Sequence, residues 1–300
     1  MKIQNLKHLK TIFILAFQLY GFIAQCQGSD KSKSMSYTIA YGSKGICLTN
    51  AEGTSEVRLT NGDHGYPAWS PDGKKLAFYS YHDEKKTWSI HIINSDGTNK
   101  KRLTHAKNKW DSTPSWSSDG KKILFAREYK NSEEVWQYEI WIMNSDGSEE
   151  TQIKPLVGGN PFFTPDGRIV FSAEFRDKKS EICIADIDGK NFSQLTNNDA
   201  NEWHPKVSPD GKQVAFSSDR DGNHEIYVMN IDGSNQKRLT NIPTGDYGAS
   251  WSPDGSQIIF QSKGEKGDKE TNVYIINKDG SSLRKITSNT GWQPMWLKNN

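Results

Sequence analysis

The sequence predicts an all-β fold built from one short unit that is repeated along the chain. The phrase YPAWSPDGKKLAFYS (66–80) returns as TPSWSSDGKKILFAR (113–127), HPKVSPDGKQVAFSS (204–218) and GASWSPDGSQIIFQS (248–262). The copies also stay in phase, and Asp-Gly pairs separate the apolar runs within each copy. Repetition of this kind indicates a repeat architecture, in which each copy is one structural unit.

The period of the repeat is 44 to 47 residues, measured at the aromatic position of the first phrase or its equivalent. The six positions are Trp69, Trp116, Phe163, Val207, Trp251 and Trp296. A second phrase of the type IYVMNIDGSNQKRLT (226–240) follows the first five of them. A further copy of this second phrase, ICLTNAEGTSEVRLT (46–60), comes before them all.

Each unit contains four short apolar runs, which in 203–240 are PKVS, QVAFSS, EIYVMN and QKRLT. The runs are rich in β-branched and aromatic residues and are bounded by Gly, Asp, Asn or Pro, a pattern typical of strands. Asp-Gly supplies the positive φ angles of tight hairpin turns. One four-stranded meander cannot bury both of its faces, so neighbouring copies must stack. Four strands at this period predict the blade of a β-propeller.

The two ends of the chain predict a closed ring of six blades. The first copy starts at YTIAY (37–41) and lacks its opening strand, whereas QPMWLK (293–298) is an opening strand alone. If the C-terminal strand completes the N-terminal blade, an open sheet edge is removed. We therefore expect one propeller domain over 37–298.

Two cysteines test this arrangement. Cys47 and Cys183 occupy the same position of the first and fourth blades, which lie opposite each other in a ring of six. Their Cα atoms would then be too far apart for a disulfide. We expect two free thiols, and a disulfide between them would contradict the blade assignment.

The N-terminus has the features of an export signal over 1–25. Lys2, Lys7 and Lys10 precede a short apolar stretch, TIFILAFQLYGFIA (11–24), and polar sequence follows it. Cys26 lies where a bacterial lipoprotein carries its acylated cysteine, although Gln25 departs from the small residue expected there. The two alternatives are lipid attachment at Cys26 and cleavage nearby without a lipid. Residues 26–36 are expected to form a polar tether.

The composition indicates a folded chain without affinity for nucleic acid. Aromatic residues make up 11% of the chain, which argues against disorder. Without Lys2, Lys7 and Lys10 the chain carries 35 basic and 36 acidic side chains. This balance gives no electrostatic reason to bind nucleic acid.

The two phrases together resemble the repeat of TolB-type propellers, often called WD40-like, over about residues 37–297. The resemblance implies a six-bladed propeller that is periplasmic or associated with the outer membrane of a bacterium. In the Tol–Pal envelope system the TolB propeller binds a peptidoglycan-associated lipoprotein. About ten residues separate the expected signal from the first blade, so we expect no α/β domain like the one that precedes the propeller in TolB.

The innermost strand of each blade is expected to line the central channel, and its first residues to form the channel mouth. The candidate ligand-binding residues there are His64, Tyr66, Asp111, Glu202, Trp203, His204, Asp246, Tyr247 and Trp292. Aromatic side chains could stack on sugars or grip an apolar side chain of a peptide. In the alternative interpretation, these polar groups line a water-filled channel and accept hydrogen bonds from neighbouring loops.

Three of these residues form a candidate metal site, namely Asp111, Glu202 and Asp246. Carboxylates that converge on one axis repel each other unless a cation or a proton relieves them. Their oxygens suit calcium or magnesium, and His64 or His204 would admit manganese or zinc. We expect at most a divalent cation such as calcium or manganese as cofactor.

Our first hypothesis for function is an exported, monomeric, non-catalytic module of the cell envelope. It would bind an envelope protein or a cell-surface glycan at the channel mouth, and would reach a membrane only through a lipid on Cys26. The alternative is a metal-dependent carbohydrate-active enzyme, because oligogalacturonate lyases also look like TolB-type propellers and use a metal with histidines near the channel. A third possibility is a scaffold without a small ligand. The sequence assigns no catalytic residue, since it has no G-x-S-x-G nucleophile elbow.

Overall fold

The computed structural model describes residues 38–82, 87–175, 179–264, 270–288 and 290–297. Every regular element in these residues is a β-strand, which confirms the all-β prediction. Across the same residues, no helix has the length and apolar character needed to cross a bilayer. The expected signal (1–25), the tether (26–36) and Cys26 lie outside the described residues.

The strands form five sheets, four of which have four antiparallel strands. The first sheet has the order β24-β1-β2-β3, and its strands are β1 (Ile39–Gly42), β2 (Ile46–Thr49), β3 (Glu56–Arg58) and β24 (Trp292–Trp296). The third sheet contains β12 (Gly159–Phe163), β13 (Ile169–Glu174), β14 (Ser180–Ala185) and β15 (Ser193–Gln194). The fourth contains β16 (Glu202–Val207), β17 (Gln213–Ser218), β18 (Glu225–Asn230) and β19 (Lys237–Arg238). The fifth contains β20 (Asp246–Trp251), β21 (Gln257–Ser262), β22 (Asn272–Asn277) and β23 (Arg284–Lys285).

The second sheet has eight strands and consists of two meanders. The first meander contains β4 (His64–Trp69), β5 (Lys75–His82), β6 (Thr87–Asn94) and β7 (Lys101–Arg102). The second contains β8 (Trp110–Trp116), β9 (Lys122–Lys130), β10 (Trp136–Asn144) and β11 (Thr151–Val157). A single parallel residue pair, Trp88 with Trp110, joins the two meanders. Among the described residues no sheet closes on itself.

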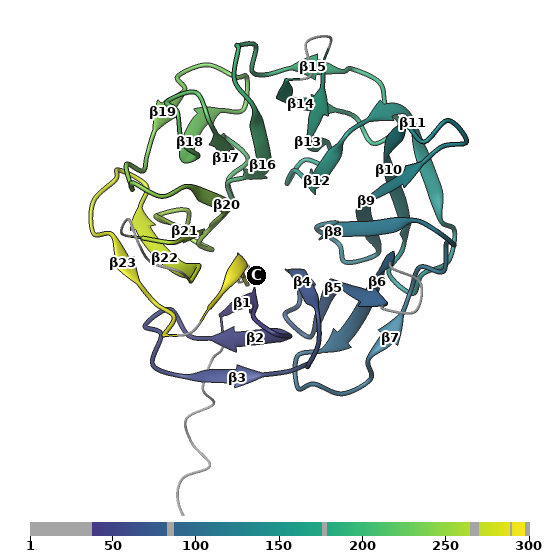
Figure 1. Cartoon of the computed structure of the whole chain (residues 1–300), viewed down its shortest axis with the longest axis horizontal. Helices are drawn as coiled ribbons and strands as arrows, with labels where there is room; N and C mark the ends of the chain where they lie inside the picture. Colours follow the sequence, from purple (N-terminus) through teal and green to yellow (C-terminus); the bar gives the residue numbers. More distant parts are fainter. Residues whose placement is uncertain (1–37, 83–86, 176–178, 265–269, 289, 298–300) are drawn as a thin grey trace, which may run out of the picture. The chain divides into compact units, whose positions relative to one another are not determined.

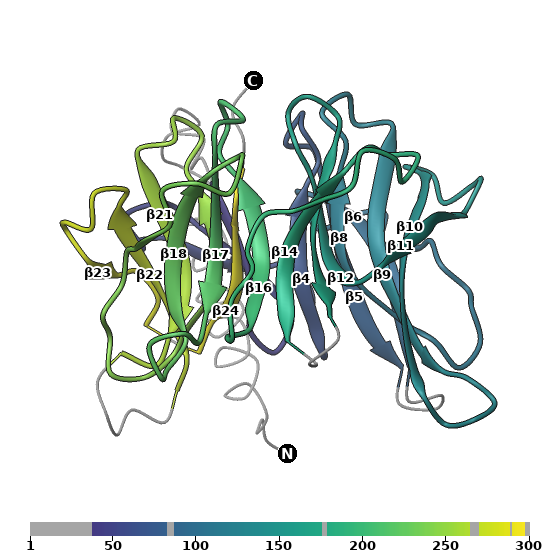
Figure 2. The ribbon, with the colours of Figure 1, turned by 90° about the horizontal axis from the view of Figure 1, so that it is seen from above.

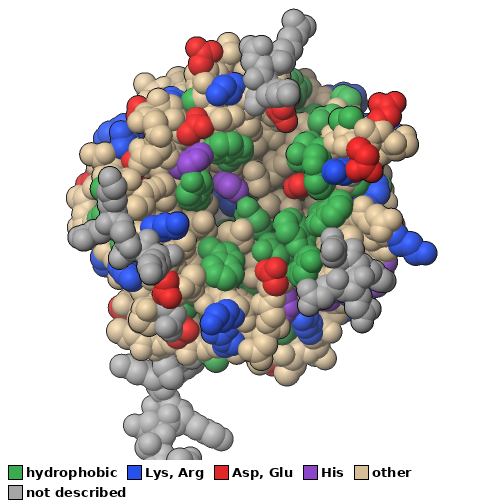
Figure 3. All heavy atoms as spheres, viewed as in Figure 1, with side chains coloured by type: hydrophobic (Ala, Val, Ile, Leu, Met, Phe, Trp, Pro, Cys, Tyr) green, Lys and Arg blue, Asp and Glu red, His purple; other side chains and the backbone are tan. Residues whose placement is uncertain are grey.

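The sheets are arranged around a common centre, with β4, β8, β12, β16 and β20 nearest to it (Figure 1). Figure 2 shows strands of neighbouring sheets standing side by side. The C-terminal strand β24 lies beside β1 and pairs Trp296 with Ile39 and Met295 with Ala40. The face that Figure 1 presents to the viewer is drawn with all atoms in Figure 3.

The S-P-D-G part of the repeat forms the turn between the first and second strands of a unit. In one copy the Ser70 hydroxyl donates to Asp72 Oδ1 at 2.7 Å and accepts from the Lys75 amide at 2.9 Å. Gly73 has a φ of 68°, which a side chain would disfavour. The same bonds recur between Ser208, Asp210 and Gln213. The phrase recurs because each hairpin needs the same turn.

The threonine of the R-L-T phrase holds the outermost strand to the third strand. Its hydroxyl accepts the backbone N–H of a residue fourteen positions earlier, as Thr240 does from Ile226 at 2.9 Å. The equivalent bonds are made by Thr60, Thr104, Thr196 and Thr287. These bonds satisfy buried backbone donors that would otherwise be unpaired.

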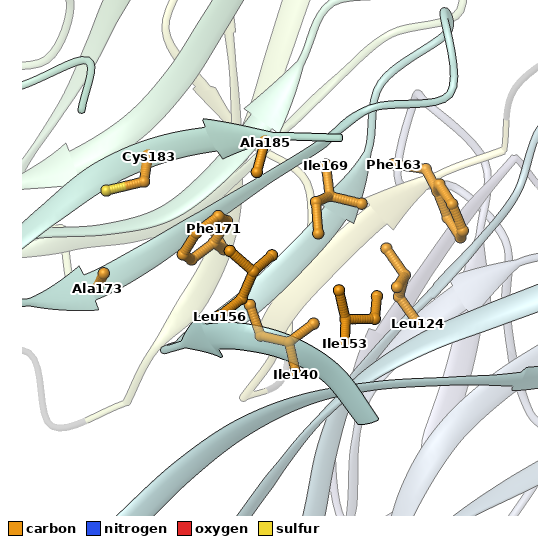
Figure 4. Close-up of a cluster of buried hydrophobic side chains, with 10 residues drawn as sticks. All are labelled: Leu124, Ile140, Ile153, Leu156, Phe163, Ile169, Phe171, Ala173, Cys183 and Ala185. Atoms are coloured by element: carbon orange, nitrogen blue, oxygen red, sulfur yellow. The ribbon is translucent and has the colours of Figure 1, made fainter. Parts of the chain in front are cut away.

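The core lies between neighbouring sheets. The large aromatic residue at the equivalent position of each second strand is fully buried: Tyr41, Phe78, Phe125, Phe171, Phe216 and Phe260. Figure 4 shows one such cluster, in which Leu124 and Ile140 of the second sheet face Phe171 and Ile169 of the third. The Trp116 indole also donates to the Ala68 carbonyl of the preceding unit at 3.0 Å. Stacking of this kind buries the faces that a single sheet would expose.

Both cysteines among the described residues are free, which confirms the prediction for them. Cys47 lies in β2 and Cys183 in β14, and both are buried. Burial raises the pKa of Cys47 to about 11 and that of Cys183 to about 12.

Candidate functional site

Each innermost strand carries a β-bulge at the residue before the proline position of the repeat. The residues there have positive φ angles between 49° and 66°, and they are Tyr66, Thr113, Asn160, His204, Gly248 and Gln293. The pairing register with the neighbouring strand shifts at the same places, for example between Gly65 and Ala68. A positive φ is uncommon for residues other than glycine, and bulges re-aim side chains. We call these six residues the collar.

The collar surrounds a narrow cavity of about 30 Å³ at the centre of the sheets. The Tyr66 hydroxyl and His204 Nε2 share a hydrogen bond of 2.9 Å, although 138 residues separate them. The Gln293 side-chain carbonyl accepts the Tyr66 amide at 2.7 Å. Burial lowers the pKa of His204 to about 4, so its imidazole is neutral near pH 7. The collar therefore narrows the channel and separates its two ends.

The end beyond the collar is lined by residues that repeat between units. A cavity of about 230 Å³ lies there among three tryptophans, Trp69, Trp116 and Trp296, and the prolines of the S-P-D-G turns, Pro71, Pro165, Pro209 and Pro253. We call it the turn end. Its lining follows from the fold, because several units contribute equivalent residues of their first strands and turns.

The opposite end is the expected mouth. The predicted acids were expected to converge on the channel there, but in the structure they are buried. Asp111 is 1% exposed and accepts two hydrogen bonds from Arg127, at 2.6 and 2.8 Å. Arg127 is itself 3% exposed and also donates to Glu150 at 2.5 Å. The Asp111 carboxylate is thus part of a buried ion pair within the second sheet and does not face the channel.

Glu202 and Asp246 are also fully buried. Glu202 Oε1 accepts from Arg220 at 2.7 Å, and burial raises the pKa of Glu202. Asp246 makes no hydrogen bond through either oxygen with the described residues. Burial raises the pKa of Asp246 to about 7, and the nearby Glu225 carboxylate adds to the shift.

His64 is 4% exposed, and its Nδ1 lies 2.7 Å from the Thr60 hydroxyl. Burial lowers the pKa of His64 to about 4. His64 and the three acids therefore belong to separate buried networks at the edges of the mouth. Throughout the described residues, no group of three or more His, Cys, Asp or Glu side chains is placed to hold a metal ion.

The predicted aromatic residues are partly exposed, as a binding surface requires. Trp203 and Tyr247 lie on either side of His224, at centroid distances of 5.0 and 4.5 Å. Tyr66 packs against Tyr79 at 6.0 Å. Trp292 is half-buried. Figure 3 shows hydrophobic side chains gathered around the central hollow of this face.

Tyr79, Trp88 and Trp110 also lie at this face and were not among the predicted site residues. Trp136 belongs to the charged insertion KNSEEVWQYE (130–139), in which Trp136 and Tyr138 could be expected from the sequence to widen a binding surface. Tyr79 stacks on Trp88 at 5.0 Å, and Trp110 contacts Trp136 at 5.2 Å. Trp136 is 42% exposed. Tyr79, Trp88 and Trp136 lie where second strands end and third strands begin. Trp110 is the first residue of the innermost strand β8. We call the mouth aromatics the aromatic rim: Tyr79, Trp88, Trp110, Trp136, Trp203, Tyr247 and Trp292.

A cavity of about 340 Å³, which we call the side pocket, opens beside the collar. It lies over β12, and its lining includes Glu128, Tyr138, Gly159, Ser172, Glu174 and Trp203. A signal for it is present in the sequence, because only this unit has glycine at both positions, Gly158 and Gly159, whereas every other unit carries at least one larger side chain there.

Known proteins share this architecture. An uncharacterized protein of Agrobacterium fabrum is 28% identical over 173 residues, which are 54% of this chain and 56% of that protein. The chain therefore matches only about half of the relative's length. TolB from Acinetobacter baumannii superposes with a TM-score of 0.75 at 21% identity, over 89% of this chain and 68% of that chain.

An oligogalacturonate lyase in complex with manganese is a more distant neighbour. It superposes with a TM-score of 0.55 at 15% identity, over 81% of this chain and 70% of that chain. Identities this low show a shared fold and nothing further about activity.

A family model described as the TolB β-propeller domain, PD40, matches residues 126–299. This match spans more than half of the chain, and its repeats are those whose turns and threonine bonds are described above. The chain belongs to the TolB β-propeller family.

Proposed function

We propose that this protein is an exported, non-catalytic binding module of the bacterial cell envelope. In this proposal the sheets form six blades, and the pairing of β24 with β1 closes the ring. The mouth binds an envelope protein or a cell-surface glycan. The observation that carries the proposal is the aromatic rim at the mouth, together with the side pocket that Trp203 of this rim lines.

The arrangement of the polar groups favours binding over catalysis. Asp111 and Glu202 each accept hydrogen bonds from an arginine, and His204 is held in the collar by Tyr66. Groups held in this way orient the strands and loops around the mouth. Partly exposed aromatic side chains are frequent centres of binding energy, because they bury a large area at low entropic cost.

The alternative is a metal-dependent lyase, for which His64 and His204 would be the candidate ligands. His64 lies in a network with Thr60, and His204 lies in the collar, so the two imidazoles do not face a common point with the acids. Turnover of a uronide by the purified protein, lost in His204→Ala, would favour this alternative. We expect no turnover by either protein.

The export signal and a lipid on Cys26 remain part of the proposal. Mass spectrometry of the N-terminal peptide from the native membrane fraction would test them. A diacylglyceryl group on Cys26 would support membrane anchoring, and an unmodified mature N-terminus near that position would leave an exported protein without an anchor.

The function is tested by capture from solubilised envelopes of the source bacterium. We expect the wild-type chain to retain a defined envelope component and Trp203→Ala to weaken that retention at least tenfold, because loss of a central aromatic anchor costs about 2 kcal/mol or more. Pro253→Ala, at the turn end, is the matched control and should bind as the wild type does. Equal retention by Trp203→Ala and the wild type would contradict binding at the mouth.

A further inference from the structure

The side pocket lies where one unit has glycine at two successive positions, Gly158 and Gly159. At the position of Gly159 the fourth and fifth sheets carry Trp203 and Tyr247, and the two meanders of the second sheet carry Gly65 and Ser112. A Cβ atom on Gly159 would meet no atom within 4 Å, whereas one on Gly158 would lie 2.3 Å from the Ser172 carbonyl oxygen. The open space at Gly159 lets the pocket pass over β12, between residues of β9 and β10 on one side and of β13 and β16 on the other.

Two acids line this pocket without a basic partner. Glu128 of β9 and Glu174 of β13 both border it, and no described residue forms an ion pair with either carboxylate. Burial raises the pKa of Glu128. Asp111 differs from these two acids, because its carboxylate forms an ion pair with Arg127. Glu128 is half-buried, whereas Glu174 is exposed at the end of β13. A half-buried carboxylate without a counter-ion, such as that of Glu128, favours a cationic ligand.

A buried hydroxyl in the same pocket also lacks a partner. Ser172 is 5% exposed, lines the pocket, and its Oγ makes no hydrogen bond with the described residues. Ser172 and Glu174 are two residues apart on β13, so they lie on the same face of the strand. Buried polar atoms are normally hydrogen-bonded, and an unpaired one calls for a ligand or a water molecule.

Aromatic surfaces border the polar groups. Trp203 and Tyr138 line the pocket, and both are partly exposed. An aromatic ring attracts a cation over its face, and it also packs against an apolar surface. The volume of about 340 Å³ is at the small end of the range of about 300–1,000 Å³ for ligand pockets, which suits a single ring-sized group.

We propose that the side pocket binds an amino sugar with a free amine. The ammonium group pairs with the Glu128 and Glu174 carboxylates, a sugar hydroxyl bonds to Ser172 Oγ, and the apolar face of the ring packs against Trp203. The unpaired Ser172 hydroxyl favours a sugar over the side chain of a lysine, because the ammonium group is the only polar group of that side chain. This inference deepens the proposed function. It rests on that function because it assumes that the same glycan extends over the aromatic rim.

The test is a titration of the full mature chain with small amines, by calorimetry or by NMR, at about pH 6.5, below the ordinary pKa of an amine. The probes are D-glucosamine, its neutral counterpart N-acetyl-D-glucosamine, and Nα-acetyl-lysine amide. We expect glucosamine to bind at least tenfold more tightly than either of the other two. Preference for the lysine derivative would overturn the amino sugar, as would equal binding of the acetylated sugar.

Two substitutions, each with its own control variant, make the titration specific to the pocket. Gly159→Trp fills the open space without a backbone clash and should abolish glucosamine binding, whereas Gly159→Ala should retain it. Glu128→Gln should weaken binding at least tenfold, and Glu134→Gln, an exposed acid outside the pocket, is the control. Undiminished binding by folded Gly159→Trp would overturn the assignment.

The experiments distinguish failure of the amino-sugar proposal from failure of the proposed function. If none of the small amines binds, the amino-sugar pocket is overturned, and the capture experiment with Trp203→Ala still tests the mouth. If glucosamine binds but Trp203→Ala captures as the wild type does, the pocket is supported and the wider role of the mouth is contradicted.

Discussion

The acids of the mouth fall into two groups that differ in their partners. Asp111 and Glu202 are buried and paired with Arg127 and Arg220, whereas Glu128 and Glu174 border a pocket without an ion pair among the described residues. A paired buried acid belongs to the fold, because removing either partner leaves an uncompensated charge. An unpaired acid at a pocket is free to pair with a ligand.

The largest effect should come from breaking a paired acid. Asp111→Ala leaves Arg127 buried with Glu150 as its one acidic partner among the described residues, and we expect it to lower the free energy of unfolding by about 3–5 kcal/mol. Urea denaturation measures this change. Glu134→Ala removes an exposed pair with Lys130 and should cost less than about 1 kcal/mol. Equal effects of the two substitutions would contradict the contrast between buried and exposed pairs.

Asp246 should give a pH-dependent effect of intermediate size. Its folded pKa of about 7 lies above its ordinary value of 3.8, so the folded state holds a proton that the unfolded state has lost between these pH values. Asp246 therefore lowers the free energy of unfolding, and this loss of stability grows as pH rises from about 4 to about 7.

We expect Asp246→Asn to gain stability relative to the wild type across this range, by more than about 1.4 kcal/mol, the equivalent of one pKa unit. Thermal or urea unfolding at several pH values measures the difference. A difference that does not change with pH would show that Asp246 is not held protonated beside Glu225.

The smallest effect on stability should come from an unpaired acid. Glu128→Gln removes a carboxylate that forms no ion pair with the described residues and whose pKa is raised by burial. We expect its free energy of unfolding near pH 7 to equal that of the wild type within about 0.5 kcal/mol, as for substitutions that break no buried network. A loss comparable to that of Asp111→Ala would place Glu128 among the structural acids.

The repeat made most of the fold predictable from sequence. The S-P-D-G turns, the threonine of R-L-T and the buried phenylalanines each recur because every sheet needs the same hydrogen bond or core residue. The free state of Cys47 and Cys183 followed from the same alignment.

The site was harder to predict, for two physical reasons. Alternation along a strand decides which side chains face the channel, and the bulges at Tyr66 and His204 shift that alternation. The acids Asp111, Glu202 and Asp246 were therefore expected to face the channel at the mouth, but they are buried there. Their arginine partners come from second strands or the loops after them, as Arg127 and Arg220 do, and no spacing rule connects them in advance.

The central claim is that ligand binds at the mouth and not at the turn end. Amide hydrogen exchange, with and without the envelope component that the wild-type chain retains, tests it most directly. We predict slower exchange at 158–160, 202–204 and 246–248 on binding, and unchanged exchange at the turns 208–211 and 252–255. Protection confined to those turns would contradict the account.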